Sequence, residues 1–180
     1  MQLAVDERLV REGGSILIPS RAVSRTPEEQ ANIVLLFASS DGWMDRVRLR
    51  TEQRWYERLY QSPDHDIWVI SWLPGQSTGF HDHGESSGAF VVATGVLEEH
   101  RLSEQPVVIP PGKSRAFGPN YAHDVRNVSL GPAVSIHVYS PPLSEMNEYE
   151  LDGGDWSRAK RRLSELTRLT RSRTCRAGNQ

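Results

Sequence analysis

The spacing of apolar and polar residues changes near residue 53, and the change divides the chain into two parts. Before it, the apolar residues fall on one side of a helix, and they are Ile33, Val34, Leu36 and Phe37. Thr26-Pro27-Glu28-Glu29 precedes them and provides an N-cap, a helical proline and a glutamate at the third position. A second short helix is predicted from Trp43 to Arg50. Residues 1–52 are therefore expected to form a helical cover over one end of the domain.

From residue 53 onward the apolar residues recur with a period of two, which is typical of strands. The predicted strands are residues 55–60, 66–73, 89–97 with an interruption at Gly95, 105–109, 123–128 and 133–139. Glycine and proline turns, such as Pro110-Pro111-Gly112, separate several of them. Many short strands joined by such turns predict a β-sandwich or barrel over residues 53–145.

The spacing changes again after Pro141-Pro142, which ends the last predicted strand. Leu163, Leu166 and Leu169 recur three residues apart among arginines and a lysine. This pattern predicts a basic helix over residues 155–170 that packs on the barrel, followed by a disordered tail over 171–180.

Length and composition indicate one domain over residues 1–180, with 37% hydrophobic and 24% charged residues. The net charge of −2 does not favour nucleic acid or an anionic membrane as a partner. No apolar run approaches the roughly 20 residues of a membrane span, and the N-terminus lacks the apolar region of a signal peptide. The single cysteine excludes an intrachain disulfide. We expect a cytoplasmic protein.

The first candidate for chemistry is a histidine pair, His81 and His83, with one residue between them. On a strand both side chains leave the same face, so both rings can point into one cavity. The surrounding residues resemble the first motif of the cupin barrels, with spacing Gly75-x5-His81-x-His83-x4-Gly88-x6-Gly95. Gly112 and then His123-x3-Asn127 resemble the second motif, although Gly118 and Asn120 replace its usual proline and glycine. The resemblance implies a mainly β cupin (double-stranded β-helix) barrel with His81, His83 and His123 as metal ligands.

Three histidines suit a catalytic metal, because imidazole binds iron, nickel, copper and zinc and three protein ligands leave positions open. Cupins usually have a glutamate where this chain has Gly88, so no carboxylate of the motif neutralises the metal. Such a site favours an anionic, chelating substrate. The alternative is a cupin whose metal site is vestigial.

The second candidate is the strand that contains Ser135, His137 and Tyr139, which alternate onto one face. If that face lines the barrel, the three polar groups need partners, and a Ser–His–Tyr relay would satisfy them mutually. The relay would present the Tyr139 phenol to a molecule at the metal. The alternative is that these residues face outward into solvent.

The third candidate is Arg58, which shares a strand face with Tyr56. An arginine inside a barrel can bind a carboxylate through two parallel hydrogen bonds. A surface salt bridge is the alternative.

Four segments together resemble the bacterial cysteine dioxygenases of the cupin superfamily: WYERLY, WLPGQSTGFHDHGESSGAFVV, HDVRN and SIHVYSPP. The resemblance implies non-haem Fe(II) held by the three histidines, and a substrate carboxylate at Arg58, beside Tyr56. It also implies that the Ser135–His137–Tyr139 relay lies near the substrate, and that L-cysteine and O2 give cysteine sulfinic acid. Mammalian members have a cysteine, cross-linked to the tyrosine, at the position of Gly88, so no Cys–Tyr cross-link is expected here.

Two alternatives stay open at this point. The 3-mercaptopropionate dioxygenases share the histidines and the relay but tend to have glutamine at the position of Arg58. A metal-binding cupin that senses a small molecule without turnover is the other alternative.

Overall fold

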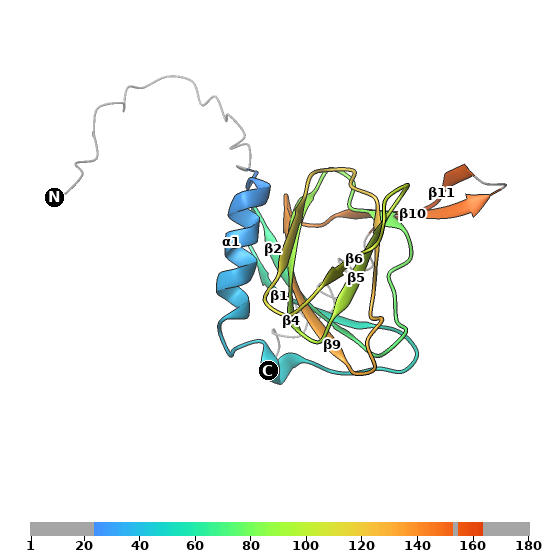
Figure 1. Cartoon of the computed structure of the whole chain (residues 1–180). Coiled ribbons are helices and arrows are strands. Elements are labelled where there is room, and N and C mark those ends of the chain that lie inside the picture. The colour runs from blue at the N-terminus through green and yellow to red at the C-terminus, as the bar shows by residue number, and fades with distance from the viewer. Residues whose placement is uncertain (1–23, 153–154, 164–180) are drawn as a thin grey trace, which may run out of the picture.

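The computed structural model of the chain describes residues 24–152 and 155–163. Within them, two antiparallel sheets face each other as a barrel, and one α-helix lies beside it (Figure 1). The five-stranded sheet has the order β1 (Trp55–Gln61), β2 (Asp66–Trp72), β9 (Ala133–Ser140), β4 (Ser87–Thr94) and β7 (Ser114–Phe117). The six-stranded sheet has the order β11 (Asp155–Leu163), β10 (Glu145–Asp152), β3 (His81–Asp82), β8 (His123–Arg126), β5 (Leu97–Arg101) and β6 (Val107–Ile109). The prediction of a mainly β barrel is confirmed.

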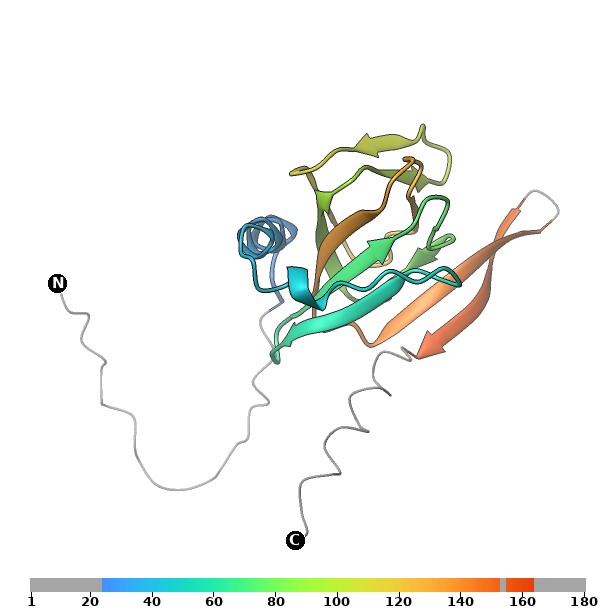
Figure 2. The same cartoon turned by 90° about the horizontal axis from the view of Figure 1, so that it is seen from below.

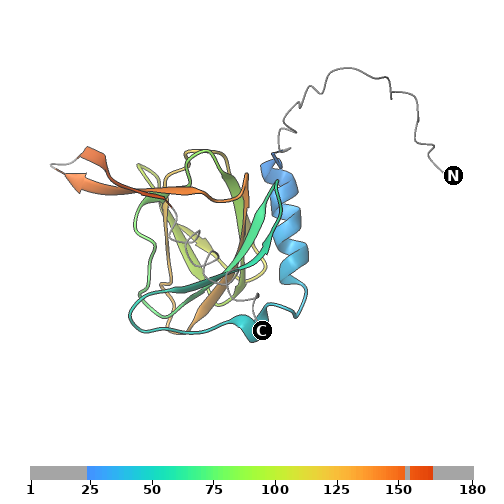
Figure 3. The same ribbon diagram turned by 180° about the vertical axis from the view of Figure 1, so that it is seen from behind.

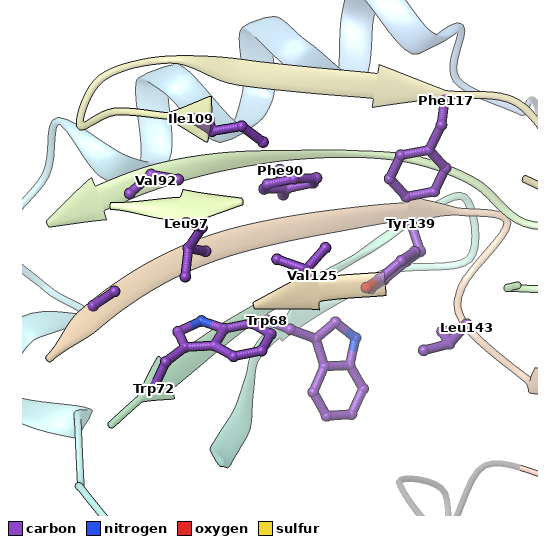
Figure 4. Packing of buried hydrophobic residues seen from close by; sticks show 11 residues of the cluster. Trp68, Trp72, Phe90, Val92, Leu97, Ile109, Phe117, Val125, Tyr139 and Leu143 are labelled. Atoms are coloured by element: carbon purple, nitrogen blue, oxygen red, sulfur yellow. The ribbon is translucent and has the colours of Figure 1, made fainter. Parts of the chain in front are cut away.

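The inner faces of the two sheets enclose one hydrophobic core. It combines Trp68, Trp72 and Phe90 from the five-stranded sheet with Leu97, Ile109 and Val125 from the other, all at most 4% exposed. Figure 4 shows this cluster between the strands, with Trp72 and Tyr139 toward opposite ends. Since residues of both sheets contribute, this core holds the barrel together.

A second core lies on the outer face of the five-stranded sheet, against helix α1 (Pro27–Ala38). Alternate residues of the central strands, among them Val69, Val91 and Ile136, pack there with Val34 of the helix. Figure 2 views α1 nearly end-on beside this sheet. The helix thus covers a sheet face rather than one end of the barrel. Because β2, β4 and β9 are covered on both faces, their residues are almost all buried.

The capping residues of α1 behave as the sequence predicts. Thr26 Oγ1 accepts a hydrogen bond from the Glu29 backbone, and the Glu29 carboxylate accepts one from the Thr26 backbone. The second predicted helix, Trp43 to Arg50, is reduced to a 3-10 turn over Met44–Arg46, and Val47 is already extended. Trp43 is 3% exposed and packs in the outer core, so the chain leaves the helical conformation soon after this anchor.

The C-terminal prediction is wrong where the structure describes it. Residues 155–163 form strand β11, which pairs with β10 from Asp155 opposite Asp152 to Leu163 opposite Glu145. The hairpin projects from the barrel (Figure 3). The leucine spacing within this segment gives no information on the backbone hydrogen bonds that β10 supplies. These bonds outweigh the weak helical preference of the segment. The rest of the predicted helix, the tail over 171–180 and the first 23 residues lie outside the described residues.

No helix within the described ranges is long and apolar enough to cross a membrane.

Candidate metal centre and adjoining cavity

Three histidines meet at one end of the barrel interior. His81 lies in β3 directly opposite His123 in β8, and His83 follows His81 by two residues. One ring nitrogen from each of the three lies within 4.8 Å of the others, and no ring is more than 3% exposed. The structure therefore brings together the three histidines that the sequence predicts.

The rings of His81 and His83 are neutral, so their lone pairs are available to a cation. Burial, followed by the neighbouring His123, holds the pKa of His81 well below its usual value. Burial and then His81 do the same for His83. The Nε2 atoms of His81 and His83 face each other at 3.2 Å.

The outer nitrogens of the rings have different partners. His81 Nδ1 lies 2.9 Å from the Gly79 carbonyl oxygen, and His123 Nδ1 lies 2.8 Å from Glu99 Oε1. Both acceptors require N–H at Nδ1, which leaves Nε2 free to bind a metal. Buried His83 Nδ1 has no hydrogen-bond partner among the described residues. This donor set fits a divalent transition metal held by three imidazoles.

The predicted relay faces the barrel interior. Ser135 Oγ lies 2.7 Å from His137 Nε2, and His137 Nδ1 lies 3.4 Å from the Tyr139 hydroxyl. The three side chains are at most 5% exposed, while Ile136 and Val138 pack on the outer face. Trp72 Nε1 donates a hydrogen bond of 3.0 Å to Ser135 Oγ and extends the network by one residue.

Burial controls the ionisation of this network. It lowers the pKa of His137 to about 3, with nearby His123 and Arg54 as smaller causes. It also raises the pKa of the Tyr139 phenol, and the Asp66 carboxylate adds to that increase. Both side chains are therefore neutral near pH 7, and Tyr139 keeps its proton.

A cavity of about 100 Å³ adjoins the histidines. His81, His123, His137 and Tyr139 line it together with apolar residues such as Trp68 and Ile70. Two charged side chains, Arg54 and Glu148, also line it. A cavity of this size accommodates a molecule of only a few heavy atoms, so the room suits a small substrate.

The arginine in this cavity is Arg54, and Arg58 is not among the lining residues. Arg58 Nη1 lies 3.9 Å from the carboxylate of Asp66, and its guanidinium stacks 5.2 Å from the Trp68 ring. The alternation that places Arg58 and Tyr56 on one face is correct, and Tyr56 does line the cavity. However, the same alternation includes Arg54, which lies just before β1 and nearer the histidines. The sequence pattern therefore placed both arginines on this face, but nothing in it indicated which of the two lines the cavity.

Gly88 lies opposite Tyr139 in β9 and opposite Phe117 in β7. A Cβ atom at Gly88 would come within 2.5 Å of the Phe117 ring and 2.9 Å of the Val138 carbonyl oxygen. The Phe117 ring uses this room and stacks on His83, with ring centroids 5.1 Å apart. The absence of a side chain at Gly88 thus makes space for an aromatic ring against a candidate metal ligand.

Residues 27–152 match the family described as cysteine dioxygenase type I. The chain belongs to this family. Membership of this family indicates a dioxygenase that acts on a small-molecule thiol with O2. The three clustered histidines fit the non-haem metal site of such an enzyme.

Solved structures share the fold of this cysteine dioxygenase family member. It is similar to a Thermus thermophilus protein with 26% identity and a TM-score of 0.50, over 55% of this chain and 94% of that one. A Klebsiella pneumoniae protein with a double-stranded β-helix domain has 18% identity and a TM-score of 0.52, over 65% and 93% of the two chains. An RmlC-like cupin from Desulfovibrio desulfuricans has 22% identity and a TM-score of 0.52, over 58% and 97%. The cupin fold is therefore confirmed.

Proposed function

We propose that the protein is an Fe(II)-dependent cysteine dioxygenase that converts L-cysteine and O2 to cysteine sulfinic acid. The observation that carries this proposal is one small cavity lined by two of the clustered histidines, a partly buried arginine and a neutral tyrosine. Fe(II), when bound by His81, His83 and His123, supplies the redox chemistry that joins both oxygen atoms to sulfur.

The histidines favour a thiolate as the ligand. All three are neutral donors, so the charge of a divalent metal is not neutralised by the protein groups that bind it. A free thiol with a pKa near 8.5 becomes a thiolate at such a centre. The site thereby selects an anionic sulfur ligand.

Arg54 binds the substrate carboxylate in this proposal, in place of Arg58. Burial lowers the pKa of Arg54, and no hydrogen-bond partner among the described residues meets its buried Nε. Its Nη1 donates to the Ser77 carbonyl at 3.2 Å, which holds the guanidinium in position. A carboxylate in the cavity would accept a hydrogen bond from Nε, with Tyr56 beside it.

Tyr139 donates a hydrogen bond to the substrate. The indole N–H of Trp72 can only donate, so Ser135 Oγ accepts a hydrogen bond from it. The Ser135 hydroxyl is then free to donate a hydrogen bond to His137 Nε2. Neutral His137 then carries its proton on Nδ1 and donates to the Tyr139 oxygen. This arrangement leaves the phenol proton of Tyr139 directed to the molecule in the cavity.

Glu148 favours L-cysteine over 3-mercaptopropionate. It lines the same cavity and interacts electrostatically with Arg54. A substrate with both an ammonium or amine group and a carboxylate suits this pair of opposite charges better than a carboxylate alone.

The test is oxygen consumption by the Fe(II)-loaded protein with L-cysteine, 3-mercaptopropionate and cysteamine. We expect uptake with L-cysteine, with a KM raised about 10- to 100-fold in Arg54→Gln, since a hydrogen bond to a charged group contributes about 1.5–3 kcal/mol. Cysteamine lacks a carboxylate, so its KM should change little in that variant. Arg58→Gln is the matched control, and we expect it to affect stability more than KM.

The other outcomes separate the alternatives. A higher KM in Arg58→Gln alone would return the carboxylate site to Arg58. Preference for 3-mercaptopropionate would keep the reaction and change the substrate. An iron-loaded protein that consumes no oxygen with any of the thiols would refute the proposal and leave a metal-binding cupin.

A further inference from the structure

One buried carboxylate contacts the metal centre from outside the cavity. Glu99 in β5 is 1% exposed and does not line the cavity. Its Oε1 lies 2.8 Å from His123 Nδ1, and the Tyr121 hydroxyl donates to the same oxygen at 3.3 Å. Its Oε2 accepts a hydrogen bond of 2.8 Å from Arg115 Nε.

These partners fix the carboxylate as an anion in one orientation. The ion pair with Arg115 compensates its charge on the side away from the metal, and Arg115 is itself 36% exposed. Tyr121 is held in turn by Arg101, whose guanidinium lies 4.7 Å from the tyrosine ring. Because both Glu99 oxygens accept hydrogen bonds, the carboxylate is held in contact with His123.

Glu99 makes His123 different from the other two ligands. His81 meets a neutral carbonyl, and His83 Nδ1 has no partner among the described residues. A carboxylate on Nδ1 fixes the tautomer, orients the ring and raises the basicity of the nitrogen that binds metal. Among the described residues, no other hydrogen bond to an Nδ1 atom of these three histidines comes from a negatively charged group.

We propose that Glu99 is a positioning residue that makes His123 the strongest donor of the three histidines and thereby sets the metal affinity and redox potential of the centre. The inference rests on the metal site of the proposed function. Through His123, the carboxylate stabilises the higher charge of an oxidised metal more than that of the reduced one.

The experiment is a competitive titration of Glu99→Gln with Co(II) and Fe(II) against a chelating dye, together with the Fe(III)/Fe(II) potential. Glutamine keeps the size of the side chain and an oxygen that can accept from His123. It removes the charge and replaces the acceptor that faces Arg115 with an N–H donor. We expect metal affinity to fall about 10- to 100-fold and the potential to become more positive. A purely structural role for Glu99 would not move the potential in this way.

Two matched variants complete the test. Glu98→Gln makes the same chemical change one residue away on β5, where the carboxylate pairs with His100 at 2.6 Å, and we expect wild-type affinity. Glu99→Gln combined with Arg115→Gln should bind metal as weakly as Glu99→Gln alone. Recovery of affinity in the double variant would assign the loss to an unpaired arginine and overturn the inference.

The remaining outcomes distinguish this inference from the proposed function. Wild-type affinity and potential in Glu99→Gln would overturn the role of Glu99 while the metal centre stands. A wild-type protein that binds neither metal would overturn both.

Discussion

At the scale of the residue, the space beside Gly88 determines how the ring of one metal ligand is supported. Phe117 occupies that space, stacks on His83 and also lies with its ring centroid 6.4 Å from that of Tyr139. Phe117 is 4% exposed, so its ring has little room to move away. Gly88 and Phe117 therefore act as one packing unit. The Tyr139 hydroxyl lies 3.4 Å from His137 Nδ1, so this hydrogen bond and the packing of Phe117 both contact the tyrosine.

Gly88→Ala tests this unit. The added Cβ would meet both the Phe117 ring and the backbone oxygen of Val138 at less than 3.0 Å, so one of them must shift. We expect a loss of about 1–3 kcal/mol in unfolding free energy from overpacking, and weaker metal binding because Phe117 no longer supports His83. Denaturant unfolding and Co(II) titration measure the two effects. Gly42→Ala is the control, since no atom lies within 4 Å of that position; equal behaviour of the two variants would contradict the packing argument.

At the scale of the element, helix α1 stabilises the sheet that holds the relay without contributing to the cavity. Its Gln30 side chain donates to Ser87 Oγ at 2.8 Å, and Ser87 donates to the Ser140 carbonyl at 3.0 Å. These bonds join the helix to β4 and β9 on the outer face. The relay occupies the inner face of β9, so α1 supports its strand from behind.

Thr26→Ala tests the contribution of the helix. The substitution removes the side-chain cap on the Glu29 backbone N–H and should lower the unfolding free energy by about 1 kcal/mol. Metal affinity should not change, because α1 does not line the cavity. Thr26→Ser keeps a hydroxyl and is expected to unfold like the wild type. Identical denaturation curves for the alanine and serine variants would show that the cap adds no stability.

At the scale of the whole molecule, buried ionisable groups make stability depend on pH. His81, His83 and His137 stay neutral in the folded protein below the pH at which free histidine takes up a proton. Their contribution to stability is present above about pH 6.5 and is lost as the pH falls. Asp66 acts in the opposite direction, because burial raises its pKa to about 6. As the pH falls from about 6 toward the ordinary pKa of an aspartate, Asp66 therefore contributes increasingly to the stability of the folded protein.

Between pH 6.5 and 5.5, the three histidines should have a larger effect than Asp66 on the stability of the metal-free protein. Three such groups lower the unfolding free energy by about 3 kcal/mol over that unit. Asp66 restores a smaller part of this, which leaves a net loss of about 2 kcal/mol. Denaturant unfolding at the two pH values measures it. In Asp66→Asn the loss should be larger, because the opposing group is removed. A stability that is constant over this range would mean that the rings take up protons in the folded state.

Residue patterns along the chain predicted the helix cap at Thr26, several of the strands, the three clustered histidines, and the single face that Ser135, His137 and Tyr139 share. The cap, the strands and the shared face depend on residue spacing within one element, which fixes the side on which a side chain lies. His123 was joined to His81 and His83 through the resemblance to the cupin motifs. The tertiary structure was needed to show that Arg54 lines the cavity and Arg58 does not, that the Phe117 ring lies beside Gly88, and that Glu99 contacts His123. These contacts join segments that are distant in the sequence, and spacing along the chain does not specify which distant side chain fills a given space. Strand β11 follows the same rule, because its hydrogen bonds come from β10.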